Sequence, residues 1–224
     1  MKVGTELDWT SRVVLRGVEW AGPAAQAAVQ LDQGGFHGRL DATRAFQSGD
    51  PDGAGLRAGY ARTWGETGPT VGVEMTQSWY SRLPAGATRS TTEAGVTATW
   101  AVAGGLKPGV AWWHDFRRLG DTAEARLAAE YPLPRWGTYL EAEVFAGWTV
   151  ADNVRPDAPA SRLHDAYGYG GAGIRLPYRI VGTRVTVVLG AQLTETTGQH
   201  PDWSPLGRPS GALASVNLGA DLDF

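Results

Sequence analysis

The sequence lacks cysteine, long apolar runs and helical periodicity, and each absence removes a class of protein. Without cysteine the chain has no disulfide bond, no thiol nucleophile and no cysteine-ligated zinc. No run of about 18 apolar residues occurs, which excludes a transmembrane helix. Met1 leads directly into "KVGTELDW", with neither the basic nor the apolar segment of a signal peptide. If the protein is exported, we expect this to be its mature form.

The sequence is rich in glycine and tryptophan, and its acidic and basic residues nearly balance. It contains 31 glycines and 10 tryptophans in 224 residues, and no linker or shift in composition divides it. We therefore predict a single domain over residues 1–224, a length that a β protein reaches undivided. The formal net charge is −3, from 20 basic and 23 acidic residues, so nothing indicates nucleic acid as a partner.

Alternation of apolar and polar residues recurs along the chain. In "SVNLGADLDF" (215–224) every second side chain from Val216 to Phe224 is apolar, and this strict alternation indicates a strand with one face in an apolar medium and one in a polar medium. Similar stretches are separated by turn residues. They predict twelve strands, at 2–17, 25–33, 35–46, 55–64, 69–82, 90–102, 106–117, 122–131, 136–151, 164–177, 183–195 and 210–224.

The connections between these strands alternate in length. "QGG", "GETG", "AGG", "PLPR" and "YRIVG" are short, whereas "QSGDPDGAG" (47–55), "NVRPDAPASRL" (153–163) and "TGQHPDWSPLGRP" (197–209) are longer and polar. An even number of antiparallel strands, with short turns at one end and longer loops at the other, is typical of an outer-membrane barrel. We therefore expect both termini at the short-turn end, on the periplasmic side.

A soluble β-sandwich is the alternative to a membrane barrel. Sandwich strands are usually about 5–6 residues long, whereas "GTYLEAEVFAGWTV" keeps its pattern beyond the about 9–11 residues that cross a bilayer. The polar face carries too many ionisable groups for a dry core, so we predict that it lines a wet lumen. The apolar face, with Leu7, Val13 and Leu15 in the first strand, then meets lipid. The candidate pore-lining residues are Glu6, Asp8, Arg12, Arg16, Arg39, Arg57, Glu74, Glu124, Arg126, Glu141, Glu143, Arg175 and Arg184.

The fold class predicted is all-β, a transmembrane up-and-down antiparallel β-barrel, and aromatic residues near the strand ends favour it. Amphipathic rings prefer the two membrane interfaces, although strand ends of other β proteins also collect aromatics. Trp9, Tyr60 and Phe145 fall in the middle of strands instead. The two predicted belts are Phe36, Trp64, Trp100, Tyr131, Trp136, Tyr178 and Phe224 near the short turns, and Trp20, Phe46, Trp79, Trp112, Phe116 and Trp148 near the long loops.

The chain ends on Phe224. The last strand has to pair with the first to close the barrel and remove both edges. A terminal aromatic residue after alternating apolar residues also resembles the signal that the outer-membrane assembly machinery recognises. We predict that Phe224 is this assembly signal, with a chance terminal phenylalanine as the alternative.

The N-terminal part of the chain resembles the TorF-like porin family. The resemblance lies in "SRVVLRG" (11–17), a strand that ends in Arg16 and Gly17, and in "GPAAQAAVQLD" (22–32) and "GGFHGRLDAT" (34–43). It implies a small porin-like barrel without a defined substrate, and it transfers no ligand role to either residue of the Arg-Gly pair. That family usually has an aromatic residue in the Arg-Gly strand, where this chain has "VVL".

"GYGGAG" (168–173) satisfies the dinucleotide pattern G-x-G-x-x-G. That pattern needs a helix after it, so that phosphate meets the helix N-terminus. Here another strand stretch, "IRLPYRI", follows. We therefore interpret the glycines as places where the barrel wall bends and large side chains fit, with Tyr167 and Tyr169 pointing inward.

Metal sites are considered at the histidines and at "GDPDG" (49–53). The histidines are isolated in sequence, so a zinc site needs ligands from distant strands. Asp50 and Asp52 are possible calcium ligands, but Asp, Pro and Gly at this spacing are ordinary in turns. We predict no metal and no cofactor. The histidines are His37, His114, His164 and His200.

Catalytic arrangements are considered at Ser78 and Ser81 and at Glu141 and Glu143. A lipid-directed serine enzyme needs a histidine at matching height on a neighbouring strand, and the sequence offers none. The two glutamates share one face at a separation that suits acid–base hydrolysis. Charges of both signs on the adjacent strand face the same lumen, so an ion-pair network is favoured and the protein is predicted not to be an enzyme.

The function predicted is a small outer-membrane porin-like channel for passive diffusion of small hydrophilic solutes, with a mild cation preference. The alternative is a non-conducting barrel, closed by ion pairs, with a structural or interaction role. A lipid-directed enzyme is the third. We expect no segment long enough to be a dedicated plug. The expected partners are outer-membrane lipids, the barrel assembly machinery and small solutes, and the sequence leaves the oligomeric state open.

Overall fold

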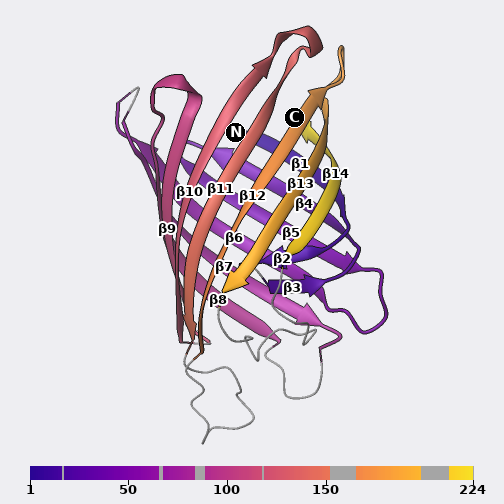
Figure 1. Cartoon of the computed structure of the whole chain (residues 1–224), viewed down its shortest axis with the longest axis vertical. Helices are drawn as coiled ribbons and strands as arrows, with labels where there is room; N and C mark the ends of the chain where they lie inside the picture. Colours follow the sequence, from indigo (N-terminus) through magenta and orange to yellow (C-terminus); the bar gives the residue numbers. More distant parts are fainter. Residues whose placement is uncertain are drawn as a thin grey trace, which may run out of the picture.

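A computed structural model describes residues 1–16, 18–65, 68–83, 89–117, 119–151, 165–197 and 212–223. In these ranges twelve antiparallel strands form one closed barrel (Figure 1). The prediction of an all-β barrel is confirmed. The wall strands are β1 (Lys2–Thr10), β4 (Ala24–Gln33), β5 (Phe36–Ala45), β6 (Asp52–Thr63), β7 (Thr70–Ser81), β8 (Ser90–Thr99), β9 (Leu106–Asp115), β10 (Gly120–Leu133), β11 (Thr138–Ala151), β12 (Asp165–Arg179), β13 (Val185–Thr197) and β14 (Leu213–Asp223).

The barrel closes between its first and last strands. β1 pairs with β14, with Gly4 opposite Asp223, so neither strand keeps a free edge. On its other side β1 pairs with β4, with Lys2 opposite Asp32. The short β4–β5 turn follows directly, so the described chain ends lie at the short-turn end of the barrel (Figure 1).

The predicted end of the first strand is wrong. It was expected over residues 2–17, but β1 ends at Thr10. The residues that follow form a separate two-stranded sheet of β2 (Val13–Leu15) and β3 (Val18–Ala21). Thr10 and Ala24 are register partners, so this excursion starts and ends at the same height of the wall. We call β2, β3 and their flanking residues the lumen hairpin. Figure 1 shows it within the outline of the barrel, near the long-loop end.

Several expectations for this segment are corrected by the lumen hairpin. Val13 and Leu15 do not face lipid, because both line cavities inside the barrel. Trp20 does not belong to the aromatic belt, because it is only 6% exposed and stacks on Tyr80. The expectation that no segment is long enough to be a dedicated plug did not anticipate this hairpin, whose residues lie inside the barrel. A hairpin between two adjacent wall strands is long enough to enter it.

The outer face of the wall carries large apolar side chains. Leu7, Val73 and Val144 are 63%, 54% and 53% exposed, which is unfavourable in water and suits lipid contact. Phe145 and Tyr169, by contrast, lie on the inner side. The belt residues that are exposed on the outer face are Phe36, Trp64, Trp100, Tyr131, Trp136 and Tyr178 near the short turns, and Phe46, Trp79, Trp112, Phe116 and Trp148 near the long loops.

Helical structure in the described ranges consists of two 3₁₀ turns, η1 (Ala103–Gly105) and η2 (Pro134–Trp136), both in short connections. Within those ranges no helix is long and apolar enough to cross a membrane. "GYGGAG" (168–173) lies inside β12, and the strand continues to Arg179. The interpretation of these glycines as part of the barrel wall is confirmed.

Candidate functional site

The inner wall carries paired charges of opposite sign. Alternate residues of each wall strand point inward, so neighbouring strands bring acidic and basic side chains together. The expected interleaving of signs on neighbouring strands is found in three of the five pairs, whereas Arg126 pairs within β10 and Arg39 reaches from β5 across β4 to β1. The pairs are Arg39 with Glu6 (2.7 Å), Arg57 with Glu74 (3.5 Å), Lys107 with Glu130 (2.5 Å), Arg126 with Glu124 (2.5 Å) and Arg175 with Glu141 (3.5 Å).

At the level of the lumen hairpin, three inward carboxylates have no ion pair with a described residue. They are Asp8 on β1, Asp41 on β5 and Glu143 on β11. On the basic side, the guanidinium of Arg12 on the lumen hairpin also has no described ion-pair partner. The charges left unneutralised at this level of the lumen are therefore mostly acidic.

The tip of the lumen hairpin is fixed on the far side of the barrel. Arg16, between β2 and β3, donates from both terminal nitrogens to the two carboxylate oxygens of Glu93 on β8, at 2.9 and 2.8 Å. The two side chains are 15% and 16% exposed, and the guanidinium also lies 5.5 Å from the ring centre of Trp113 on β9. Burial alone would lower the pKa of Arg16, but the Glu93 carboxylate outweighs it and raises that pKa.

The flanks of the lumen hairpin pack against aromatic side chains from two parts of the wall. On one side Val18 contacts Tyr167 and Tyr169 of β12, with Phe145 of β11 beside them. These tyrosines are 1% and 4% exposed, and the Tyr169 hydroxyl donates to Glu124 at 2.8 Å. Gly147 makes room for the Tyr169 ring, because a Cβ there would overlap it. The inward orientation predicted for both tyrosines is confirmed.

On the other side the hairpin is held by β7 and by the β5–β6 loop. Trp20 stacks on Tyr80 with ring centres 4.5 Å apart. Asp50, 4% exposed, accepts a hydrogen bond from the Gly22 amide at 2.7 Å. Asp52 pairs with arginines on neighbouring strands. "GDPDG" (49–53) thus anchors the hairpin base and the strand end.

Metal ligands do not gather in the described part of the chain. No group of three or more His, Asp or Glu side chains that could hold a metal ion occurs there. His37 lies 3.4 Å from Glu74, which also pairs with Arg57, and His114 lies 3.1 Å from Asp121. His164 and His200 lie outside the described residues.

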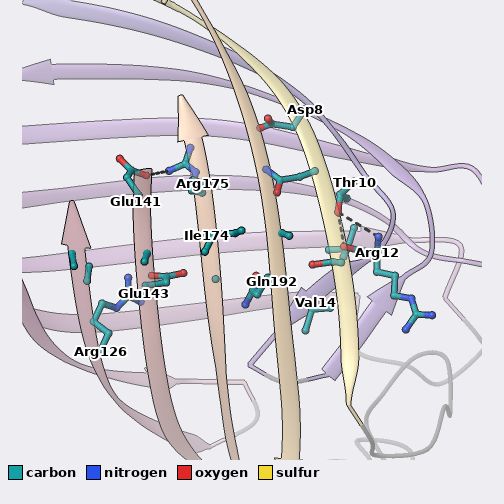
Figure 2. A pocket seen from close by; sticks show the side chains of 18 of the residues that line it. Asp8, Thr10, Arg12, Val14, Arg126, Glu141, Glu143, Ile174, Arg175 and Gln192 are labelled. Atoms are coloured by element: carbon teal, nitrogen blue, oxygen red, sulfur yellow. Dashed lines mark hydrogen bonds and ion pairs between the residues drawn. The ribbon is translucent and has the colours of Figure 1, made fainter. Parts of the chain in front are cut away.

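The lumen hairpin has a cavity on each side of it. The larger, of about 570 Å³, lies between the hairpin and β9–β14 and holds Arg126, Glu141, Glu143 and Arg175 (Figure 2). The second, of about 320 Å³, lies between the hairpin and β4–β7. A third, of about 450 Å³, opens at the short-turn end beside Glu6. The residues that line both of the first two cavities are Asp8, Val13, Val14 and Gln26.

The predicted pore residues occupy three different positions. Those on the wall strands lie in the lumen, as described above. Arg12 and Arg16 are also inside the barrel, but they belong to the lumen hairpin and not to a wall strand. Arg184 lies in the β12–β13 turn, exposed at the short-turn end. Phe224 and Gly17 lie outside the described residues.

Sequence reasoning missed the lumen hairpin and therefore the roles of Val18, Trp20 and Asp50. One signal was available. The three consecutive apolar residues of "VVL" (13–15) break the strict alternation that a lipid-facing strand keeps. The pairing of Arg16 with Glu93 joins residues 77 positions apart, and nothing in the sequence indicates such a partner.

Comparison with known proteins relates this chain to porins by its fold. No family model matches it, and no curated protein does. Among solved structures, KdgM porin in complex with disordered oligogalacturonate aligns with a TM-score of 0.58 at 10% identity, over 100% of this chain and 99% of that one. NanC porin aligns with a TM-score of 0.58 at 11% identity, over 97% and 98%. The chain is therefore a transmembrane β-barrel with the fold of these porins.

Proposed function

We propose that this protein is a small porin of the bacterial outer membrane, through which small hydrophilic solutes diffuse passively. The observation that carries the proposal is a lumen with charged and amide side chains around cavities of about 570 and 320 Å³. Such a lining holds water and hydrated solutes, whereas the exposed apolar outer face requires lipid. The shared fold with porins adds support.

The lumen hairpin makes this channel narrow. It crosses the barrel from β1 and β4 to Glu93 on β8, and aromatic contacts hold both of its flanks. Twelve-stranded barrels lie between the side-chain-filled barrels of about 8 strands and the open porins of about 16–18. A hairpin inside a barrel of this size leaves room for small solutes only.

A mild cation preference belongs to the same proposal. Most lumen arginines are neutralised by ion pairs, while Asp8, Asp41 and Glu143 are not. Rings or clusters of one sign at a constriction set ion preference. In the two cavities beside the hairpin, the excess of unpaired carboxylates over the single unpaired Arg12 supports a preference for cations.

The proposal also covers membrane placement and assembly. We place the short-turn end, with both termini, on the periplasmic side, and we treat residues 1–224 as one domain. Phe224 is proposed as the signal that the barrel assembly machinery reads, and the resemblance to TorF-like porins is kept as part of the proposal. The even strand number and the alternating loop lengths support this arrangement.

A second candidate is a non-conducting barrel with a structural or interaction role. The lumen hairpin and its bidentate Arg16–Glu93 pair favour it, because both occupy space that an open porin leaves to water. The two candidates differ in one measurable property, which is ion flow.

The deciding experiment is single-channel recording of the purified protein in planar bilayers. Folding is first checked by β-type circular dichroism and by different gel migration before and after boiling. We expect discrete steps of small conductance, with a reversal potential in a salt gradient that indicates cation preference. Folded protein that inserts but carries no current would establish the non-conducting candidate, and an anion-selective current would contradict the ion preference alone.

A further inference from the structure

The two cavities beside the lumen hairpin reach different ends of the barrel. The lining of the cavity on the β9–β14 side reaches Glu143 on β11 and Gly173 on β12. Nearer the long-loop ends of these two strands, Phe145, Tyr167 and Tyr169 cluster with Val18 of the hairpin, and none of these four lines the cavity. Those side chains pack together, and the tyrosines are almost fully buried. Among the described residues, this half of the lumen is therefore closed at the level of the hairpin.

The cavity on the β4–β7 side continues to the long-loop end. Its lining includes Pro51 and Asp52 at the start of β6 and Tyr80 near the end of β7. Toward the barrel centre the same cavity reaches Arg39 and Arg57. A solute that enters from the long loops therefore has a route on this side of the hairpin.

The two cavities meet at Asp8, Gln26, Val13 and Val14, which we call the neck. Asp8 and Gln26 are register partners on the adjacent strands β1 and β4, and the two valines face them from the hairpin. Asp8 is the only ionisable member of the neck. Figure 2 shows it with Thr10, and with Arg175 and Glu141 farther along the wall of the same cavity.

We infer that solutes pass the lumen hairpin only on the β4–β7 side and through the neck, where Asp8 sets the ion preference. This inference rests on the proposed porin function. The Asp8 carboxylate has no described ion-pair partner, so its charge is available to a passing ion. Glu143 is equally unpaired, but it lines only the larger cavity and lies outside the neck, with three wall strands between β11 and β1.

The size of the expected effect follows from the electrostatics of a narrow passage. At roughly 5 Å in water, a unit charge changes the local concentration of a monovalent ion about fourfold. Cations are enriched and anions are depleted by this same factor, so we expect Asp8→Asn to lower the cation-to-anion permeability ratio by roughly 16-fold. Glu143→Gln removes the same charge outside the neck, so we expect a smaller change in the permeability ratio.

The absence of cysteine allows a sharper test, because every introduced thiol is unique. Asp8→Cys is recorded in planar bilayers before and after an anionic and a cationic methanethiosulfonate reagent. We expect the anionic adduct to restore cation preference and the cationic adduct to reverse it. Glu143→Cys, treated in the same way, is the matched control and should shift much less.

The route is tested with two threonines near the long-loop ends of strands in different halves of the barrel. Thr43 on β5 lines the β4–β7 cavity, whereas Thr149 on β11 is 5% exposed behind the closed side. A charged thiol reagent added from the long-loop side should reduce the current of Thr43→Cys and leave Thr149→Cys unchanged. Gel migration before and after boiling confirms that each variant is folded.

The possible results distinguish a failure of this inference from a failure of the proposed porin function. Folded wild-type protein without current overturns both. If the wild type conducts but Asp8→Cys and Glu143→Cys respond alike, the role of the neck is overturned and the porin function still holds. The same conclusion follows if Thr149→Cys reacts as readily as Thr43→Cys. The expected pattern at both pairs of variants supports the inference.

Discussion

The barrel wall and the lumen hairpin use the same apolar residue types in opposite surroundings. Val144, in the middle of β11, points outward and is 53% exposed, whereas Val14 on β2 lines two polar cavities. The wall valine has two pairing strands beside it, and the hairpin valine belongs to a sheet of only two short strands. Strand pairing, and not side-chain type, therefore decides which valine meets lipid.

The largest effect on stability is expected when an arginine replaces the wall valine, and the same replacement of the hairpin valine is the comparison. An arginine on the lipid face near the bilayer midplane costs about 2–4 kcal/mol, because its charge leaves water. We expect Val144→Arg to lower the free energy of unfolding by about this amount, and Val14→Arg to change it little. Urea unfolding in lipid vesicles, followed by tryptophan fluorescence, measures both. Equal losses would show that the hairpin valine is not in a wet lumen.

Removing the lumen hairpin should have the next largest effect, this time on current. Thr10 and Ala24 are register partners, so residues 11–23 can be replaced by a two-residue Asn-Gly turn that joins β1 directly to β4. We expect a severalfold rise in single-channel conductance, because the hairpin no longer fills the lumen. Unchanged conductance in a folded variant would mean that the current is limited elsewhere.

The same contrast explains what the sequence could and could not predict. The wall strands follow from period-2 alternation and turn residues, which are local signals, and "GTYLEAEVFAGWTV" became β11 almost as expected. The hairpin depends on contacts between distant residues, such as Arg16 with Glu93 and Val18 with Tyr167. No local pattern encodes those contacts. The inward positions of Glu141 and Arg175 were predictable, but their pairing required the register of β11 on β12.

A smaller effect is expected at the tip of the lumen hairpin. Glu93→Gln leaves the Arg16 guanidinium, 15% exposed, without its counter-charge. Hydrogen bonds to charged groups contribute about 1.5–3 kcal/mol, so we expect a loss of about 1–2 kcal/mol in unfolding free energy. We also expect noisier single-channel current, because the tip is less firmly held. The stability loss is measured by urea unfolding.

A double-mutant cycle isolates this ion pair from other effects. The double variant with Arg16→Met and Glu93→Gln should be less destabilised than the sum of the two single variants. Each single variant keeps one unpaired buried charge, whereas the double variant keeps none. Strict additivity would show that the two side chains do not interact, and the hairpin would then be held by its aromatic flanks alone.

The smallest change concerns a glycine in the wall beneath the neck. Gly219 on β14 is the register partner of Asp8, and a Cβ at this position would overlap the Asp8 carboxylate oxygen Oδ1. Gly219→Ala should therefore push the carboxylate away from the wall and into the neck, at a cost of about 0.5–1.5 kcal/mol for the displaced rotamer. The net charge is unchanged, yet we expect slightly stronger cation preference and slightly lower conductance. Reversal potentials in a salt gradient measure the first.

The matched control for this change lies one strand away. Gly190 on β13 stands in the same relation to Asn217, whose amide a Cβ would also crowd. Asn217 lines the larger cavity but carries no charge, so Gly190→Ala should narrow the lumen by a similar amount without altering ion preference. If both variants shift the reversal potential equally, crowding and not the position of the Asp8 charge accounts for the effect. A shift in Gly219→Ala alone ties ion preference to where that one carboxylate lies.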